Sequence, residues 1–189
     1  MNENDLLTLI GNNWLNDNVM YQCLKILTTE NKSNFHFLDP LFYLCLEHGK
    51  DYTKFIPECP ESIFSYPNLI IPINIRKQHW ATAYFNRKTK SLIIYDPLSN
   101  REDVSNIKKR LETFFLEQAS QSNLGFIYED DIKVKQETLY PKQPSNDKSN
   151  CGIFILSYIK SIINKEITLQ VDPPKLREEW RRKLKKYLK

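Results

Sequence analysis

Residues 68–97 read NLIIPINIRKQHWATAYFNRKTKSLIIYDP and predict three consecutive β-strands. The strand-like runs cover 68–75, 79–86 and 91–97, and each is rich in β-branched and aromatic residues. Residues 86–90 separate the last two runs and have the length of a hairpin connection. The first and third runs are almost continuously apolar, which is typical of a sheet that is covered on both faces.

Segments with helical patterns lie on both sides of these strands in the sequence. An amphipathic helix with acidic residues in its first turn is predicted over 101–121, and a second helix over about 151–164. We also expect a loop and helix over 4–29, a short buried helix over 36–48 opened by Asp39 and Pro40, a loop with one helical turn over 50–67, and a strand over 126–134. The expected fold class is α+β, with a central mixed β-sheet flanked by helices.

Composition limits the classes of protein that fit. The chain has 189 residues, of which 41% are hydrophobic and 12% aromatic, and this predicts one globular domain. It has no run of about 18 apolar residues that could span a membrane, and residues 1–14 lack the features of a secretory signal. The cysteines Cys23, Cys45, Cys59 and Cys151 form no C-x-x-C pair. We therefore expect no metal, no cofactor and a reducing intracellular compartment, the cytoplasm.

Positive charge is concentrated in residues 175–189, which hold eight Lys or Arg against two Glu. The rest of the chain holds 19 basic and 21 acidic residues, so the net charge of +4 comes from this tail. Apolar side chains recur every fourth residue along it, at Leu176, Trp180, Leu184 and Leu188. We expect a helix that docks this stripe on the body and exposes its charges, with no nucleic-acid partner. A nucleic-acid or membrane-surface patch is the alternative.

A cysteine stands between loop and helix in KQPSNDKSNCGIFILSYIKSII, residues 142–163. A free cysteine at such a place is often simply buried. A cysteine at a helix N-terminus can also be a reactive thiolate, because the helix dipole favours negative charge there. The free N–H groups of the first turn can stabilise an oxyanion, and Gly152 beside Cys151 is expected to leave room for a substrate backbone.

A nucleophilic cysteine needs a base and a group that orients the base. His79 begins the second predicted strand, and Asp96 stands at the C-terminal end of the third. In an antiparallel hairpin the start of one strand lies beside the end of the next, so His79 and Asp96 are predicted neighbours. His36 and His48 flank a predicted buried helix and are interpreted as core or surface residues.

These motifs, in this order, resemble the ubiquitin-like-protein-specific cysteine proteases, which include the SUMO and Nedd proteases, the adenovirus protease and bacterial effector deubiquitinases. The matching motifs lie between about residues 10 and 165 and are Trp14-Leu15-Asn16-Asp17, His79-Trp80, Tyr95-Asp96, Gln143 and Cys151-Gly152-Ile153-Phe154. Papain-like enzymes have the opposite order, with the cysteine first. The resemblance implies the fold of that family, with the nucleophile at the N-terminus of a buried helix.

The resemblance also implies catalytic roles. His79 would be the general base, Asp96 its orienting group, Cys151 the nucleophile and Gln143 the oxyanion-hole side chain. The sequence departs from the family pattern at Asn150, where most relatives have Asp, and in a slightly longer loop after Gln143. Asn146 and Asn150 are therefore the alternatives to Gln143.

The resemblance implies substrate-binding roles as well. Trp14 and Trp80 would clamp a narrow tunnel for a Gly-Gly tail, because flat indoles exclude bulkier residues. Asp17 would meet an arginine of the modifier's tail. Core packing of the indoles and a helix cap at Asp17 are the alternatives. One protease domain over 1–189 would then comprise a helical substrate-facing part (1–67), a catalytic core (68–165) and a basic C-terminal helix (173–189).

The sequence therefore predicts a cysteine isopeptidase that cuts after the C-terminal Gly-Gly of ubiquitin or a ubiquitin-like modifier. An acetyl-CoA-dependent acetyltransferase of the same clan and an inactive modifier-binding module are the alternatives. Ubiquitin is favoured, then a Nedd-type modifier or SUMO, because arginine-rich tails suit the acidic residues Asp17, Asp39, Glu58 and Glu61. We expect a monomer, and the Lys-, Asn- and Ile-rich composition suggests a bacterial effector delivered into a host cell.

Overall fold

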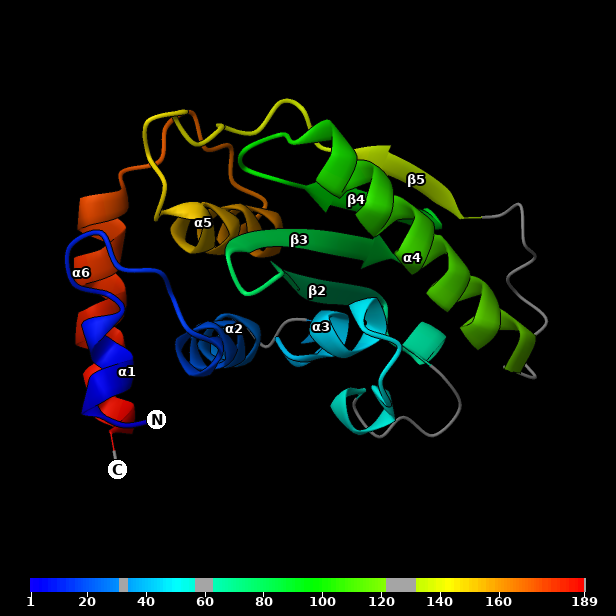
Figure 1. The fold of residues 1–189 in the computed structure, drawn as a ribbon, viewed down its shortest axis with the longest axis horizontal. Coiled ribbons are helices and arrows are strands. Elements are labelled where there is room, and N and C mark those ends of the chain that lie inside the picture. The colour runs from blue at the N-terminus through cyan, green and yellow to red at the C-terminus, as the bar shows by residue number, and fades with distance from the viewer. Residues whose placement is uncertain (31–33, 57–62, 122–131, 189) are drawn as a thin grey trace.

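The computed structural model describes residues 1–30, 34–56, 63–121 and 132–188 (Figure 1). Its strands are β1 (Phe35–Phe37), β2 (Asn68–Ile75), β3 (His79–Asn86), β4 (Ser91–Tyr95) and β5 (Lys133–Gln136). Its α-helices are α1 (Glu3–Leu7), α2 (Asp17–Glu30), α3 (Phe42–Glu47), α4 (Arg101–Gln121), α5 (Cys151–Asn164) and α6 (Pro173–Leu184). Single 3₁₀ turns are η1 (Thr53–Phe55), η2 (Ile63–Ser65) and η4 (Lys185–Tyr187).

The described strands form one mixed sheet in the order β1-β2-β3-β4-β5. β2, β3 and β4 pair antiparallel, whereas β1 lies parallel to β2 and β5 lies parallel to β4. The expected α+β class with a central mixed sheet is therefore confirmed. The strands predicted over 68–75 and 79–86 are β2 and β3, and the third ends at Tyr95 because Pro97 has no N–H to donate to a ladder.

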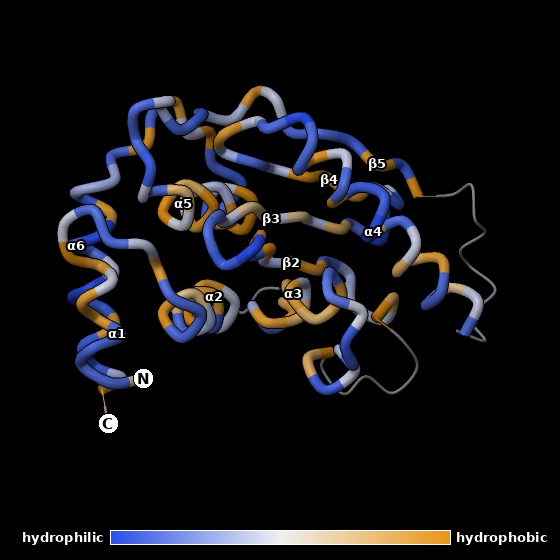
Figure 2. The backbone as a smooth tube through the Cα atoms, viewed as in Figure 1, coloured by the Kyte–Doolittle hydropathy of each residue, from blue (hydrophilic) through white to orange (hydrophobic). Residues whose placement is uncertain are grey.

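Helices cover both faces of the sheet, as the nearly continuous apolar runs predict. Successive residues of β2 point to opposite faces, so Ile70 packs in the core with α2 and α5. Leu69 and Ile71 pack in a second core with α3 and α4. Figure 1 shows these helices around the central strands, and Figure 2 shows hydrophobic residues along the strands and α5, with more hydrophilic residues along α4 and α6.

The turn between β2 and β3 sets the start of the strand that carries His79. Arg76 and Lys77 both have positive φ, 50° and 58°, and the Gln78 N–H donates to the Ile75 carbonyl over 2.9 Å. This is a β-turn with Arg76 and Lys77 at its two central positions, where positive φ normally favours Gly or Asn. Arg76 is tied to Asp103 at the start of α4 by an ion pair of 2.8 Å, which helps to hold the turn.

Several segments differ from the sequence predictions. The loop expected ahead of α2 contains the short helix α1, and the C-terminal helix expected over 173–189 ends at Leu184 and is followed by η4. Residues 36–48 are not one helix: they hold most of β1 and then α3, and the Asp39 carboxylate accepts from the Leu41 N–H over 2.9 Å just before α3. The loop over 50–67 has two helical turns instead of one, with 57–62 outside the described residues. The strand predicted over 126–134 is β5, which begins at Lys133, and 126–131 lie outside the described residues.

The C-terminal helix docks on the body through its predicted apolar stripe. Trp180 and Leu184 are buried in the core with α2 and α5, and Leu176 and Leu188 pack partly buried against it. The expectation that its charges all face solvent is wrong at Arg177, which is 4% exposed because polar groups of the body accept its hydrogen bonds. No helix among the described residues is long and apolar enough to cross a membrane.

Candidate active site

Cys151 is the first residue of α5 and is buried at the end of a cavity of about 370 Å³ that opens to solvent. The backbone N–H of Trp80 donates to its Sγ over 3.4 Å. The first N–H groups of a helix lack intrahelical acceptors and carry partial positive charge. The position therefore offers backbone donors to a negative oxygen that forms beside Cys151.

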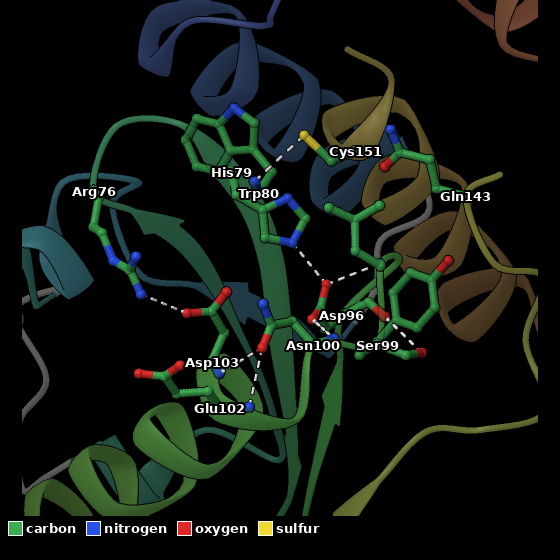
Figure 3. A network of polar contacts seen from close by, with 12 residues as sticks. Arg76, His79, Trp80, Asp96, Ser99, Asn100, Glu102, Asp103, Gln143 and Cys151 are labelled. Carbon is green, nitrogen blue, oxygen red and sulfur yellow. Dashed lines mark hydrogen bonds and ion pairs between the residues drawn. The ribbon is translucent and has the colours of Figure 1, made fainter. Parts of the chain in front are cut away.

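His79 and Asp96 lie in contact, as the hairpin pairing predicts. Thr82 pairs with Tyr95 across β3 and β4, which brings the beginning of β3 next to the residue that follows β4. The His79 Nε2 and Asp96 Oδ1 atoms are 2.6 Å apart (Figure 3). Figure 3 also shows the imidazole lying between the carboxylate and the Cys151 thiol. Cysteine, histidine and aspartate thus form a continuous chain of polar groups.

The Asp96 carboxylate is held by three donors. Its Oδ1 accepts from His79 and from the Leu98 N–H at 2.9 Å, and its Oδ2 accepts from the Asn100 N–H at 2.8 Å. The side chain is completely buried. Both oxygens therefore act as acceptors in fixed directions, which orients the imidazole and balances the cost of burying the carboxylate.

The environment of His79 favours its protonated form. Burial disfavours the charge, but hydrogen bonds to Asp96 and Cys151 and the negative charges of those groups outweigh burial and raise the pKa of His79 to about 9. An imidazolium beside the cysteine is the partner that a thiolate needs. The geometry therefore suits an imidazolium at His79 beside the Cys151 side chain at neutral pH.

Gln143 lies beside Cys151 and lines the same cavity (Figure 3). Its Nε2 donates to the Asp147 carbonyl over 2.8 Å, which leaves one amide hydrogen for a ligand, and its buried Oε1 has no partner among the described residues. The alternatives are placed differently. The Asn150 side chain is engaged by Asp147 and Arg177, and Asn146 is exposed and does not line the cavity. Of the three candidates, the position of Gln143 best suits an oxyanion donor.

The two predicted indoles have different environments. Trp14 is 44% exposed, lines the cavity, and donates from Nε1 to the Lys148 carbonyl over 2.7 Å. Trp80 is 3% exposed, packs in the core, and donates from Nε1 to the Leu15 carbonyl over 2.8 Å. Trp14 is thus available to a ligand as a wall of the cavity. Trp80 does not line the cavity. Its indole packs in the core and holds Leu15 through the hydrogen bond to the Leu15 carbonyl.

Asp17 is the first residue of α2, and its Oδ1 accepts from Asn74 Nδ2 over 3.1 Å. The helix cap expected of this region is supplied by the neighbouring Asn16, whose Oδ1 accepts from the Val19 N–H over 2.9 Å. Burial and the nearby charge of Asp17 raise the pKa of Asp39. The charge of Asp17 thus acts on Asp39, and a cationic side chain would be favoured in the field of these two carboxylates.

Gly152 packs closely against Leu15. A Cβ built at this position would lie 2.9 Å from Cδ1, 3.1 Å from Cγ and 3.2 Å from Cβ of Leu15. Leu15 is held in turn by Trp80 through its carbonyl. The absence of a side chain at Gly152 lets α5 approach the segment that carries Trp14.

We expect Gly152→Ala to lower the free energy of unfolding by about 1 kcal/mol, because overpacking of a buried contact costs about 1–3 kcal/mol and the gain in helix propensity offsets about 1 kcal/mol. Urea unfolding followed by circular dichroism measures this change. Gly49→Ala tests a different glycine, which has positive φ and open space around it. Unchanged or increased stability of Gly152→Ala would show that Leu15 accommodates the methyl group freely.

The described residues contain no cluster of three or more His, Cys, Asp or Glu side chains placed to hold a metal ion. Sequence reasoning missed one residue next to the site, Arg177, whose Nε donates to Asn150 Oδ1 over 2.7 Å. The signal was present, because Arg177, Trp180 and Leu184 follow the i, i+3, i+7 spacing of one helix face.

Comparison with known proteins identifies relatives over almost the whole chain. Residues 13–189 match the family model described as the Ulp1 protease family, C-terminal catalytic domain. Human sentrin-specific protease 3 is 29% identical over 184 residues, which cover 93% of this chain and 30% of that protein. The chain thus spans less than a third of the length of this relative.

Solved structures with a similar fold include two complexes. The C-terminal Ulp1 protease domain in complex with Smt3, the yeast orthologue of SUMO, aligns with a TM-score of 0.77 and 22% identity over 94% of this chain and 79% of that chain. The Xanthomonas campestris effector XopD bound to ubiquitin aligns with a TM-score of 0.56 and 16% identity over 91% of this chain and 92% of that chain. At these identities the similarity establishes the fold.

Proposed function

The chain belongs to the Ulp1 protease family, and from this premise we propose that it is a cysteine protease that cleaves after the C-terminal Gly-Gly of a ubiquitin-like modifier. The observation that carries the proposal is the contact of His79 with Asp96 beside the Cys151 thiol, at a cavity walled by Trp14. Nucleophile, base and orienting group are then within reach of one bound carbonyl.

In the proposed reaction the Cys151 thiolate attacks the carbonyl carbon of the terminal glycine. The resulting oxyanion accepts hydrogen bonds from the first N–H groups of α5 and from the Gln143 amide. When the intermediate collapses, the C–N bond breaks, His79 gives its proton to the departing amine, and a thioester remains on Cys151. Water, deprotonated by His79, then hydrolyses the thioester and releases the modifier and the free thiol.

Trp14 and Asp17 are proposed to select the substrate. The exposed face of the Trp14 indole would lie along a slim Gly-Gly tail and exclude residues with larger side chains. Asp17, with Asp39 near it, would attract an arginine of the modifier. Trp80 would contribute indirectly by holding Leu15, the residue after Trp14.

We propose a SUMO-type modifier as the preferred substrate and ubiquitin as the second candidate. SUMO is supported by the name of the human relative, a sentrin-specific protease, and by the yeast structure that holds Smt3. Ubiquitin is supported by the XopD complex and by the pair of carboxylates at Asp17 and Asp39. The other two acidic residues that favour ubiquitin, Glu58 and Glu61, lie outside the described residues.

Suicide probes test this function directly. The pure protein is incubated with SUMO, ubiquitin and a Nedd-type modifier, each carrying an electrophile after Gly-Gly, and the mass of the protein is followed. We expect a covalent adduct at Cys151 that forms fastest with SUMO, and no adduct with Cys151→Ala. Fastest labelling by ubiquitin would reverse the order of the two substrates. No labelling by any probe would contradict the proposed function.

The remaining predictions concern organisation and location. We propose that residues 1–189 act as one protease domain, in which 1–67 face the modifier, 68–165 supply the catalytic residues and 173–189 include the basic helix α6. The protein is proposed to act as an intracellular monomer. Delivery into a host cell as an effector has one point of support, which is the similarity in fold to XopD.

A further inference from the structure

Arg177 is the most buried of the basic side chains on α6, with 4% of its surface exposed. Its guanidinium makes four hydrogen bonds within the described residues. Nε donates to Asn150 Oδ1 over 2.7 Å, Nη1 donates to the Thr8 carbonyl over 2.9 Å, and Nη2 donates to the carbonyls of Asn13 over 2.7 Å and Ser149 over 3.1 Å. A planar fork with fixed donor directions suits such a set of acceptors, whereas a lysine has a single ammonium group.

The acceptors belong to two segments, and each segment leads into a residue that lines the catalytic cavity. Asn13 immediately precedes Trp14, the exposed wall of the cavity. Ser149 and Asn150 immediately precede Cys151. One guanidinium therefore fixes the backbone next to the substrate-facing indole and the backbone next to the nucleophile, although these segments are far apart in the sequence.

A further hydrogen bond joins the Trp14 side chain directly to the loop before Cys151. The Trp14 Nε1 atom donates to the carbonyl of Lys148, the residue before Ser149. The indole is thus attached to the loop that leads into α5. Arg177 holds the main chain next to both partners of this bond, at Asn13 and at Ser149. The orientation of Trp14 relative to Cys151 depends on this closed set of contacts.

Asn150 is the joint between Arg177 and the loop. Its Oδ1 accepts from Arg177, and its Nδ2 donates to Asp147 Oδ2 over 2.9 Å. Asp147 also accepts the N–H groups of Ser149 and Asn150 through Oδ1, over 3.1 and 3.2 Å. The Asn150 amide therefore bridges the Arg177 guanidinium and the Asp147 carboxylate, and this holds the chain that leads to Cys151. A neutral amide can make both contacts because it has both a donor and an acceptor.

Burying a guanidinium without direct contact to a carboxylate is costly. None of the hydrogen bonds that Arg177 makes within the described part of the chain goes to a carboxylate, and burial lowers its pKa. A leucine on the same helix face would pack without this desolvation cost. A role in placing the neighbouring backbone accounts for a cation at this position.

We propose that Arg177 is a positioning residue for the active site, which sets the distance and orientation between the Trp14 indole and the Cys151 thiol. This inference rests on the proposed function for its kinetic consequences, since Trp14 is there the wall that holds the substrate tail. Arg177 touches neither the substrate nor the reacting atoms. It acts through Asn13 on one side and through Ser149 and Asn150 on the other.

The kinetic test compares Arg177→Met with Arg182→Met, which removes the same charge from an exposed position on the same helix, where the side chain is 69% exposed. We expect Arg177→Met to lower kcat/KM for a modifier substrate by about 100-fold, the effect of a displacement of about 1 Å at a reacting centre. Arg182→Met should change it less than twofold. Measurements are made well below the melting temperature of each variant, so that unfolding does not contribute.

A double-mutant cycle separates positioning from general loss of structure. If Arg177 acts through the placement of Trp14, then Arg177→Met should cost much less in a Trp14→Ala background than in the wild-type chain. Arg177→Lys should recover part of the loss, because an ammonium can reach some of the four acceptors. Additive effects in the cycle, or equal losses for the Lys and Met variants, would overturn the proposal.

A spectroscopic readout does not depend on the protein being a protease. In protein labelled with ¹⁵N-tryptophan, the indole signals of Trp14, Trp80 and Trp180 are assigned by single Phe substitutions. Arg177→Met should shift the Trp14 signal and speed its exchange with solvent, because its bond to Lys148 weakens, while the Trp80 signal stays. An unchanged Trp14 signal overturns the positioning role. A changed signal in a protein that reacts with no modifier probe supports positioning and rejects the proposed function instead.

Discussion

The variant Cys151→Ala is expected to lose turnover of a Gly-Gly modifier substrate almost completely, by about 10⁶-fold in kcat, the size of loss seen when a catalytic nucleophile is removed. The thiol is the group that forms the thioester, and alanine at a buried helix start leaves the surrounding packing almost intact. Hydrolysis of a fluorogenic conjugate measures the rate. Isothermal titration with the intact modifier should show that binding is retained.

Another cysteine provides the control for this substitution. Cys45 lies on α3, is partly buried, and belongs to the opposite side of the sheet from Cys151. Cys45→Ala should keep full activity and should leave the rate of alkylation of Cys151 by iodoacetamide unchanged. If Cys151→Ala retains measurable turnover above the uncatalysed rate, the thioester mechanism is wrong.

The variant Asp96→Asn is expected to lower kcat/KM by between about 10²- and 10⁴-fold. Loss of the aspartate costs about 10⁴-fold in a serine triad, and a thiol, which is more acidic than a hydroxyl, depends less on its base. An asparagine cannot replace the three acceptor contacts. In one orientation the asparagine Oδ1 accepts from His79 and Leu98, but the amide hydrogens then face the Asn100 N–H, which is also a donor. In the reverse orientation the amide hydrogens face the His79 imidazole and the Leu98 N–H.

The pH dependence of Asp96→Asn follows from the environment of His79. With Asp96 in place the pKa of His79 is raised to about 9, so the imidazolium is kept at neutral pH and lost as the pH rises through about 9. Removing the negative charge lowers that pKa. The basic fall of kcat/KM should therefore begin near pH 9 in the wild-type protein and at a lower pH in the variant.

A profile of kcat/KM from pH 5 to 10.5 on the same substrate measures both effects. Glu112→Gln, which neutralises a half-exposed carboxylate on α4, is the matched control and should leave the profile unchanged. An identical basic limb in the wild-type protein and in Asp96→Asn would contradict the assignment of Asp96 as the partner of His79.

Much of the central fold could be predicted because it is encoded locally. The bounds of β2, β3, α4 and α5 follow from runs of one periodicity that end at turn residues or charged first turns. The contact of His79 with Asp96 follows from the geometry of a hairpin, without knowledge of any other part of the chain.

The remaining features depend on contacts between distant segments. The three residues of β1 form a strand only because Asn68, Leu69 and Ile70 lie beside them in register. Gly152 faces Leu15, and Arg177 faces carbonyls of the first fifteen residues, and neither relation leaves a local pattern. The burial of Trp80 and the exposure of Trp14 also depend on the tertiary structure, since Trp80 packs in the core whereas Trp14 lines the cavity.

The span of the Arg177 contacts has a consequence for the timing of biosynthesis. The sheet pairs each strand with its neighbour in chain order, so its strands can associate soon after they leave the ribosome. The hydrogen bonds from Arg177 to Thr8 and Asn13 join positions 169 and 164 residues apart. A nascent chain therefore carries its sheet and its cysteine helix before the last connection around the thiol can form. The proposed proteolytic activity is then acquired only after α6 has left the ribosome.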